Sequence, residues 1–239
     1  MRRYDVVFFD LGFTLMYFFP SFLELNLHAL HEAGVSVSME RLLDARKELD
    51  LRLQATRPTA TFPPTEEADR AREIALRRQL LQILGIDSDK VLQRFMERED
   101  AIYAEPGALR LYPEVKEVLH GLRAMGYRLG IISNWSWNLR ARCAQLGIAD
   151  DFDLILASAY AGVEKPHPAI FRLALETLRV APERAIHVGD NYTADVLGAR
   201  NAGLDAVLIC RDETPPADET AVIHDLRELL PLLACRNVR

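Results

Sequence analysis

The stretch Ala185-Ile186-His187-Val188-Gly189-Asp190-Asn191-Tyr192-Thr193-Ala194-Asp195 indicates both the type of fold and the place of a site. It begins with four mostly apolar residues, a pattern typical of a short strand that is buried on both faces of a sheet. Two carboxylates five residues apart follow, and residues 193–202 then have the apolar spacing of a helix. A buried strand, a polar turn and a helix in succession form the repeating unit of an α/β fold.

Similar units occur along much of the chain. Short apolar runs predict further buried strands at residues 5–9, 128–132, 153–157 and 206–210. Helical patterns lie between several of these runs, at residues 113–125, 137–146 and 168–178. Strands that alternate with helices of this length predict a parallel sheet in an α/β fold.

Residues 16–107 have a different character, because they contain no strand-like run and their apolar periodicity predicts helices. These helices are expected at residues 22–33, 39–54, 66–84 and 89–104. Residues 56–64 hold three prolines and predict an exposed loop, and Thr65 is placed to cap the helix that follows. An all-helical insertion directly after the first strand predicts a second, smaller domain.

The composition is that of an ordinary soluble globular protein, with 27% charged and 49% hydrophobic residues among 239. The formal net charge of −6 disfavours nucleic acid or an anionic membrane as the main partner, and no apolar run is long enough to span a membrane. The sequence leaves both a monomer and a dimer open. Three widely spaced cysteines predict neither a disulfide framework nor a metal site and fit a reducing cytoplasm; they are Cys143, Cys210 and Cys235.

One expected helix carries a local cluster of arginines. Acidic residues are interleaved with them, so the cluster predicts a solvated helix face and no anion-binding patch. The arginines are Arg70, Arg72, Arg77 and Arg78.

Polar residues follow the predicted strands at matching places. Asp10, Ser133 and Asp190 each stand at the carboxyl end of a strand, and Lys165 follows the run at residues 153–157 by eight residues. Ligands of α/β sheets bind beyond the carboxyl ends of the strands, so these side chains are expected to meet at one edge. Such a set can transfer a phosphoryl group, with Asp10 attacking phosphorus to form an aspartyl-phosphate.

The same edge is expected to hold a magnesium ion, which prefers oxygen ligands. Asp10 and Asp190 would supply carboxylates, and Gly12 would supply its carbonyl oxygen. Asp195 would either orient a metal-bound water or bind the ion directly, and a role in complementing the helix dipole is equally compatible with its position.

Ser133, Asn134 and Lys165 are the expected phosphate-binding residues. The hydroxyl of Ser133 and nearby backbone N–H groups would hold a phosphate oxygen, and Lys165 would neutralise the charge of the nucleophile and the phosphate. Lys165 differs from an ordinary solvated lysine because Pro166-His167-Pro168 follows it and forms a rigid entry to a helix. His187 lies inside a predicted strand and is expected to be a core histidine.

These motifs together resemble those of the haloacid dehalogenase-like hydrolase superfamily. The segment 10–14 resembles its first motif, Ser133 its second, Lys165 its third, and Asp190 with Asp195 its fourth. The resemblance implies a Rossmann-like three-layer core from residues 1–15 and 108–239, and a mobile helical cap from residues 16–107. It also implies magnesium-dependent hydrolysis of a phosphate ester, with a small phosphorylated metabolite as substrate.

The chain departs from this pattern at Gly12. Phosphatases of the family carry a second aspartate there, two residues after the nucleophile, which protonates the leaving group and then activates water. Glycine can do neither, and general acid–base catalysis typically contributes ~10²–10⁴-fold to a rate.

Three interpretations follow from this departure. The chain can be a phosphatase that is slow or needs a good leaving group. It can instead resemble the 2-haloacid dehalogenases, which also lack the second aspartate, but these have a serine where this chain has Asp190 and use no metal. It can also be a non-catalytic binding protein, although the presence of Asp10, Lys165 and Asp190 together argues against this. Phosphonatases need a cap lysine, for which only Lys47 and Lys90 are available, in no recognisable context.

Overall fold

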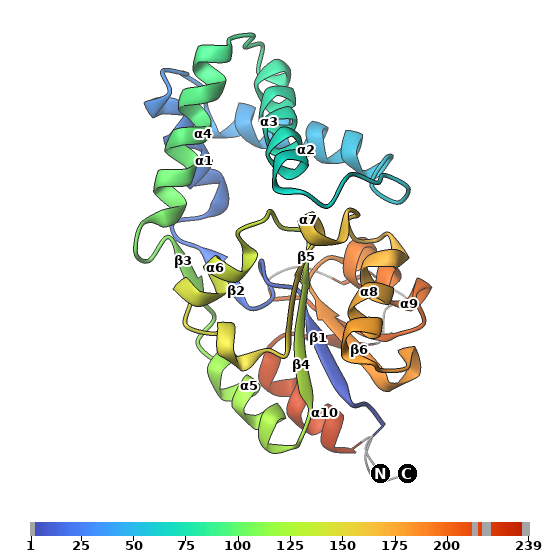
Figure 1. The fold of residues 1–239 in the computed structure, drawn as a ribbon. Coiled ribbons are helices and arrows are strands. Elements are labelled where there is room, and N and C mark those ends of the chain that lie inside the picture. Colours follow the sequence, from blue (N-terminus) through green and yellow to red (C-terminus); the bar gives the residue numbers. More distant parts are fainter. Residues whose placement is uncertain (1–2, 212–214, 217–220, 236–239) are drawn as a thin grey trace.

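The computed structural model describes residues 3–211, 215–216 and 221–235, which form a parallel sheet flanked by helices and a helical group beyond one end of the sheet (Figure 1). The strand order is β5-β4-β1-β6-β7-β8, and every neighbouring pair is parallel. The predicted α/β class is confirmed, and the five predicted strands lie within one residue of their expected bounds. The strands are β1 (Val6–Phe9), β4 (Arg128–Ser133), β5 (Leu154–Ala157), β6 (Ala185–Gly189), β7 (Asp205–Ile209) and the two-residue β8 (Val222–Ile223), which was not predicted.

Helices cover both faces of this sheet and give three layers (Figure 1). The alternation along β1 shows this, since Val7 and Phe9 pack into one apolar cluster while Val6 and Phe8 pack into the other. One face is covered by α5 (Val115–Ala124), α6 (Leu139–Gln145) and α10 (Leu229–Cys235), and the other by α8 (Pro168–Leu178) and α9 (Gly198–Asn201).

The helical group has an apolar core of its own. It consists of α1 (Phe22–Glu32), α2 (Met39–Gln54), α3 (Glu66–Ile83) and α4 (Asp89–Ala104). The Thr65 side chain accepts a hydrogen bond from the Ala68 N–H, so the predicted cap of α3 is confirmed. The division of the chain into a core and a cap at residues 16 and 107 stays a prediction.

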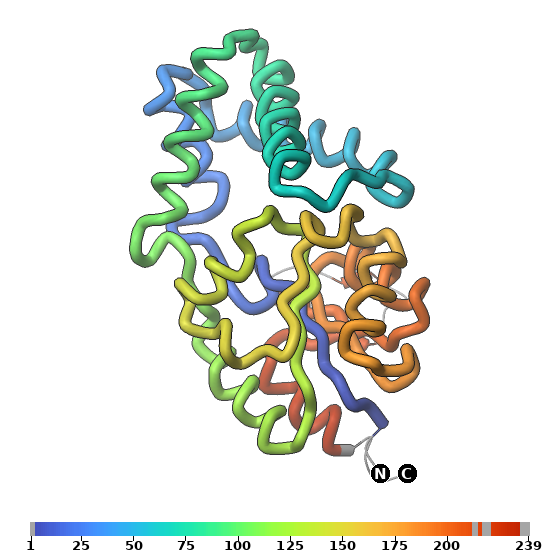
Figure 2. Tube along the Cα trace, in the orientation of Figure 1, coloured from blue at the N-terminus to red at the C-terminus, as the bar shows by residue number. Residues whose placement is uncertain are grey.

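The chain passes between the helical group and the sheet twice, and the two passages pair with each other (Figure 2). They form an antiparallel pair of strands, β2 (Met16–Phe18) and β3 (Leu109–Leu111). The prediction that residues 16–107 contain no strand was therefore wrong. Three residues are too few for a visible alternation, and the partner strand lies far away in the sequence.

Glu164, in a loop of the sheet-containing part, joins the two parts by ion pairs. Its Oε2 accepts a hydrogen bond from Arg57 Nε at 2.8 Å, and its Oε1 pairs with Arg72 of α3. Beside it, the Phe62 N–H donates to the Gly162 carbonyl at 2.8 Å, so residues 56–64 rest on the core at this point.

The prediction that the arginine cluster forms a solvated helix face is correct for two of its four arginines. Arg70 and Arg78 keep 63% and 42% of their side-chain surface exposed, whereas Arg72 and Arg77 keep 20% and 23%. The two buried arginines pair with carboxylates outside α3, which the local sequence does not reveal; these are Glu164 for Arg72 and Glu99 for Arg77.

Two of the composition-based predictions can be compared with the described residues. Cys143 and Cys210 are buried, while the side chain of Cys235 lies outside the part of the chain that the structure describes. Within the same described ranges, none of the helices is both long and apolar enough to cross a membrane.

We predict that Glu164→Gln loosens the contact between the helical group and the core. Hydrogen bonds to charged groups contribute about 1.5–3 kcal/mol each, and the neutral amide would remove the counter-ion of Arg57 and leave Arg72 with Asp69 alone. Small-angle X-ray scattering should show a larger radius of gyration, and urea should unfold the variant at a lower concentration. Glu48→Gln removes the exposed Arg52–Glu48 pair of α2 and serves as the control. Equal radii for the two variants would contradict the role of Glu164.

Candidate active site

The carboxyl edge of the sheet holds a buried lysine between two carboxylates. Asp10 is the first residue after β1, and its N–H donates to the Val188 carbonyl at 2.9 Å. Lys165 Nζ donates to Asp10 Oδ1 and to Asp195 Oδ1, both at 2.6 Å. The three side chains come from three different segments and lie almost out of reach of solvent. Four of the sequence-predicted site residues therefore share one place, since Asp190 follows the neighbouring strand β6.

Asp10, Asp190 and Asp195 form a compact acidic group. One oxygen or more from each lies within 4.8 Å of the others. Thr14 Oγ1 donates to Asp190 Oδ1 at 3.1 Å, which fixes that carboxylate from the loop after β1. Lys165 contacts the other two acids, so Asp190 has no cation within salt-bridge distance among the described residues.

Asp195 is held against the backbone of β6. It lies in a π-helical turn, Tyr192–Leu197, where the sequence had predicted the start of an ordinary helix. Its Oδ2 accepts the Asn191 N–H at 3.0 Å. An added Cβ at Gly189 would lie 2.2 Å from Asp195 Cγ, so only glycine leaves room for this carboxylate.

His187 is the site residue that the sequence reasoning placed only in the core. It is fully buried, as expected, but its Nε2 lies 3.0 Å from Asp195 Oδ1 and donates to it, because a carboxylate can only accept. Nδ1 has no partner within the described part of the chain. Residues 187 and 189 lie on the same face of β6, and Asp195 packs against Gly189. The two-residue spacing between His187 and Gly189 was therefore the sequence signal that could have placed His187 beside Asp195.

Burial and the neighbouring charges set the protonation of the site. Burial raises the pKa of Asp190 to about 8, with a further contribution from the Asp10 and Asp195 carboxylates. Burial also raises the pKa of Asp10, although the charge of Lys165 opposes this. For Asp195, burial acts upward but the charge of Lys165 and the hydrogen bond from His187 outweigh it and hold the pKa low.

The net pKa shifts of Lys165 and His187 have opposite directions. Burial would lower the pKa of Lys165, but the charges of Asp10 and Asp195 outweigh it, so the pKa lies above its usual value and the ammonium persists. Burial lowers the pKa of His187 despite its hydrogen bond to Asp195, which keeps the imidazole neutral. The fixed positive charge of the site is therefore that of Lys165.

Ser133 and Asn134 stand at the end of β4, beside Asp10. Ser133 is 2% exposed, and its side chain acts to lower the pKa of Asp10. Asn134 holds the backbone of Lys165 from both sides, since Oδ1 accepts the Lys165 N–H at 2.7 Å and Nδ2 donates to its carbonyl at 2.9 Å. These two hydrogen bonds make Asn134 a residue that positions Lys165. The predicted contact between Asn134 and a phosphate stays a prediction.

Position 12 has room for a side chain. The atom nearest to an added Cβ at Gly12 is Trp135 Cζ3 at 3.8 Å, an ordinary contact. Phe18 stacks on the same indole, with ring centroids 6.5 Å apart and nearly parallel planes. Trp135 therefore borders the space beside Gly12, with Phe18 stacked on it.

Comparison with known proteins places these features in a family. Residues 4–203 match the model of the haloacid dehalogenase-like hydrolases. A phosphoserine phosphatase from Thermus thermophilus is 39% identical over 141 residues, and a glyceraldehyde 3-phosphate phosphatase from Methanothermobacter thermautotrophicus is 35% identical over 137 residues. These matches cover 57% and 52% of this chain and span 57% and 59% of the relatives' lengths.

Solved structures resemble the whole chain. A 2-haloacid dehalogenase from Pseudomonas syringae has a TM-score of 0.67 at 29% identity, over 98% of this chain and 100% of that one. A HAD phosphatase from Thermococcus onnurineus has a TM-score of 0.68 at 24% identity, over 96% and 97%, and supports the fold alone.

We predict that Gly189→Ala destabilises the protein while Gly12→Ala does not. The added methyl group at position 189 would collide with Asp195, and overpacking of this kind costs about 1–3 kcal/mol. Neither glycine has a left-handed backbone, so the two variants differ only in available space. Urea unfolding should give a lower midpoint for Gly189→Ala alone. Equal midpoints would mean that Asp195 is not held against β6 as described.

Proposed function

Because the chain belongs to the haloacid dehalogenase-like hydrolase family, we propose that it is a magnesium-dependent phosphatase acting through an aspartyl-phosphate. Its substrate would be a small phosphorylated metabolite of the cytoplasm. The observation that carries the proposal is the acidic group of Asp10, Asp190 and Asp195 with Lys165 between two of its members.

The donor set fits magnesium. Asp190 is a half-buried carboxylate that the lysine does not neutralise, and a cation would supply the missing charge. Asp10, Asp190 and the Gly12 carbonyl would hold the ion with hard oxygen donors, as magnesium prefers. The oxygens of Asp195 are engaged by Lys165, His187 and the Asn191 N–H, which favours its role as an orienting residue over direct ligation. When bound, the ion would neutralise the charge of the phosphate oxygens.

The chain's own residues would then carry the reaction. Asp10 would attack phosphorus, so that a bond forms between its carboxylate oxygen and phosphorus while the bond to the ester oxygen breaks. Lys165 would favour the ionised form of Asp10 against the effect of burial and would orient its carboxylate, and Ser133 would hold an oxygen of the phosphate. Water would hydrolyse the aspartyl-phosphate, with no carboxylate at position 12 to activate it.

Displacement of halide from a 2-haloacid is the second candidate. Gly12 favours it, since that reaction needs no acid for the leaving group, and one similar structure is a 2-haloacid dehalogenase. Asp190 opposes it, because a carboxylate there adds negative charge that a metal-free site cannot offset. A phosphonatase reaction has less support, since Lys47 and Lys90 are both exposed.

A panel of phosphate esters and chloro-acids, each with and without magnesium, distinguishes these candidates. Phosphate release that requires magnesium is the expected result, and Asp10→Asn should abolish it while keeping the folded structure. Halide release without magnesium would instead select the dehalogenase. If neither product forms but magnesium still binds, the protein is a non-catalytic binding protein.

We predict that magnesium raises the melting temperature of the wild type, because the ion relieves repulsion between buried carboxylates. A ligand at 100 times its Kd stabilises a protein by about 2.7 kcal/mol. Asp190→Asn should lose most of this stabilisation, whereas Asp87→Asn, an exposed acid before α4, should keep it. A thermal-shift titration measures the effect. The metal assignment is wrong if magnesium stabilises the wild type no more than it stabilises Asp190→Asn.

We predict a steep dependence on the leaving group, because Gly12 cannot protonate it. Aryl and acyl phosphates should react, and alkyl phosphates should barely react. With a good leaving group the aspartyl-phosphate should accumulate, which a burst of the first product would report. Gly12→Asp should speed the second step by about tenfold or more, since the added Cβ meets no close atom. Equal rates for alkyl and aryl esters without a burst would show that another group serves as the acid.

A further inference from the structure

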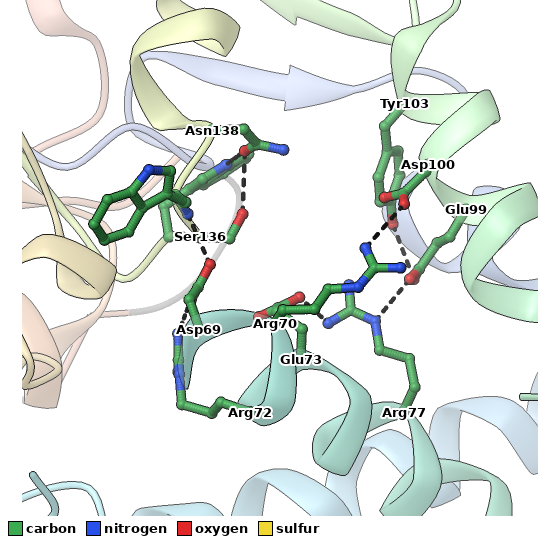
Figure 3. Close-up of polar contacts among 12 residues, drawn as sticks. Asp69, Arg70, Arg72, Glu73, Arg77, Glu99, Asp100, Tyr103, Ser136 and Asn138 are labelled. Atoms are coloured by element: carbon green, nitrogen blue, oxygen red, sulfur yellow. Dashed lines mark hydrogen bonds and ion pairs between the residues drawn. The ribbon is translucent and has the colours of Figure 1, made fainter. Parts of the chain in front are cut away.

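Two adjoining cavities lie between the helical group and the loop after β4. The smaller has a volume of about 230 Å³ and is lined by Asn134 and Trp135 of that loop, by Phe18, and by residues of α3 and α4. The larger has a volume of about 780 Å³ and extends outward along α3. Arg142 of α6 lines both. Figure 3 shows the polar side chains of α3 and α4 that face this space.

The smaller cavity adjoins the reaction site. Asn134 directly follows Ser133, which lies beside Asp10 at the end of β4, and the Asn134 side chain holds the backbone of Lys165. Trp135, which lines this cavity, also lies beside Gly12, so the cavity is next to the space that a leaving group at Asp10 could occupy. Residues that line it are placed to distinguish one leaving group from another.

Most of the charged groups around the cavities already have partners. Arg77 Nε donates to Glu99 at 2.8 Å, and its other nitrogens pair with Glu73 (Figure 3). Arg70 lies 3.8 Å from Asp100. These pairs offset one another, so they give the cavity little net attraction for a charged ligand.

Arg142 is different. Its Nη1 donates to the Tyr103 carbonyl at 2.9 Å and to Gln145 Oε1 at 3.0 Å, two neutral acceptors. Among the residues that the structure describes, no carboxylate forms a salt bridge with it. The charge of Asp100 acts on the pKa of Arg142 without forming a salt bridge with it. A half-buried guanidinium that hydrogen-bonds only to neutral acceptors is well suited to bind a planar anion through paired hydrogen bonds.

We propose that Arg142 binds a carboxylate carried by the leaving group, so that the preferred substrates are phosphate compounds with a carboxylate on a good leaving group. The inference rests on the proposed phosphatase function. A carboxylate fits better than a second phosphate, because acidic side chains outnumber arginines in the lining of the larger cavity and would repel a dianion. Tyr103 and Gln145 orient the guanidinium toward the shared space of the two cavities.

The test compares O-phosphoserine with O-phosphoethanolamine, which differ only in the carboxylate. Both are alkyl phosphates and are used as competitive inhibitors of 4-nitrophenyl phosphate hydrolysis. The wild type should bind O-phosphoserine about tenfold more tightly or better. Arg142→Gln should bring the ratio of the two inhibition constants close to one, and Arg142→Lys should keep part of the preference. Arg140→Gln, an exposed arginine of the same helix, is the control and should keep the full ratio.

The ratio isolates binding of the carboxylate from any structural effect. Loss of the contact from Arg142 to Tyr103 would weaken both inhibitors alike and leave their ratio unchanged. A ratio near one in the wild type, or a ratio that persists in Arg142→Gln, would overturn the proposal. The melting temperature with each compound gives a second readout that needs no turnover. If O-phosphoserine stabilises the protein more than O-phosphoethanolamine does but no ester is hydrolysed, the carboxylate site is supported and the phosphatase function is contradicted. If esters are hydrolysed but the two compounds stabilise the protein equally, the phosphatase function is supported and the carboxylate site is contradicted.

Discussion

The buried ammonium of Lys165 between Asp10 and Asp195 is the interaction on which the rest of the site depends. It joins the loop after β1 to the turn after β6, and removing one member of such a buried pair typically costs about 3–5 kcal/mol. Two further contacts hold its partners in place: Asn134 fixes the backbone of the lysine, and Gly189 leaves room for Asp195. The lysine leaves Asp190 uncompensated, and this single imbalance of charge is the physical basis for proposing a metal.

The loop that carries Lys165 also meets the helical group. Glu164 is its immediate neighbour and pairs with Arg57 and Arg72, so the residue that pairs with Asp10 and the residue that contacts the helices are adjacent in the chain. Movement of the helices relative to the sheet would therefore displace Glu164, which is joined to Lys165 by one peptide bond. This arrangement couples enclosure of the cavities to the geometry of the reaction site.

The features that could be predicted from the sequence are those with a local sequence pattern. Buried strands leave apolar runs, and polar residues at their carboxyl ends must meet in a parallel sheet, so the approach of Asp10, Asp190 and Lys165 could be expected. Features that arise from contacts between segments far apart in the sequence could not be predicted. The β2–β3 pair joins segments far apart in the sequence, and Arg72 differs from its exposed neighbours only because Glu164 faces it. Likewise, the cavity beside Arg142 exists only once α3 and α4 lie over the loop after β4.

The central claim is that Asp10 becomes covalently phosphorylated. Rapid acid quenching during hydrolysis of 4-nitrophenyl phosphate with magnesium, followed by proteolysis and mass spectrometry, tests it directly. The account predicts that the peptide containing Asp10 gains the mass of one phosphoryl group, that hydroxylamine removes this mass, and that Asp10→Asn never gains it. Steady release of phosphate with Asp10 unmodified at every quench time, or with the phosphoryl group on another residue, would contradict the account.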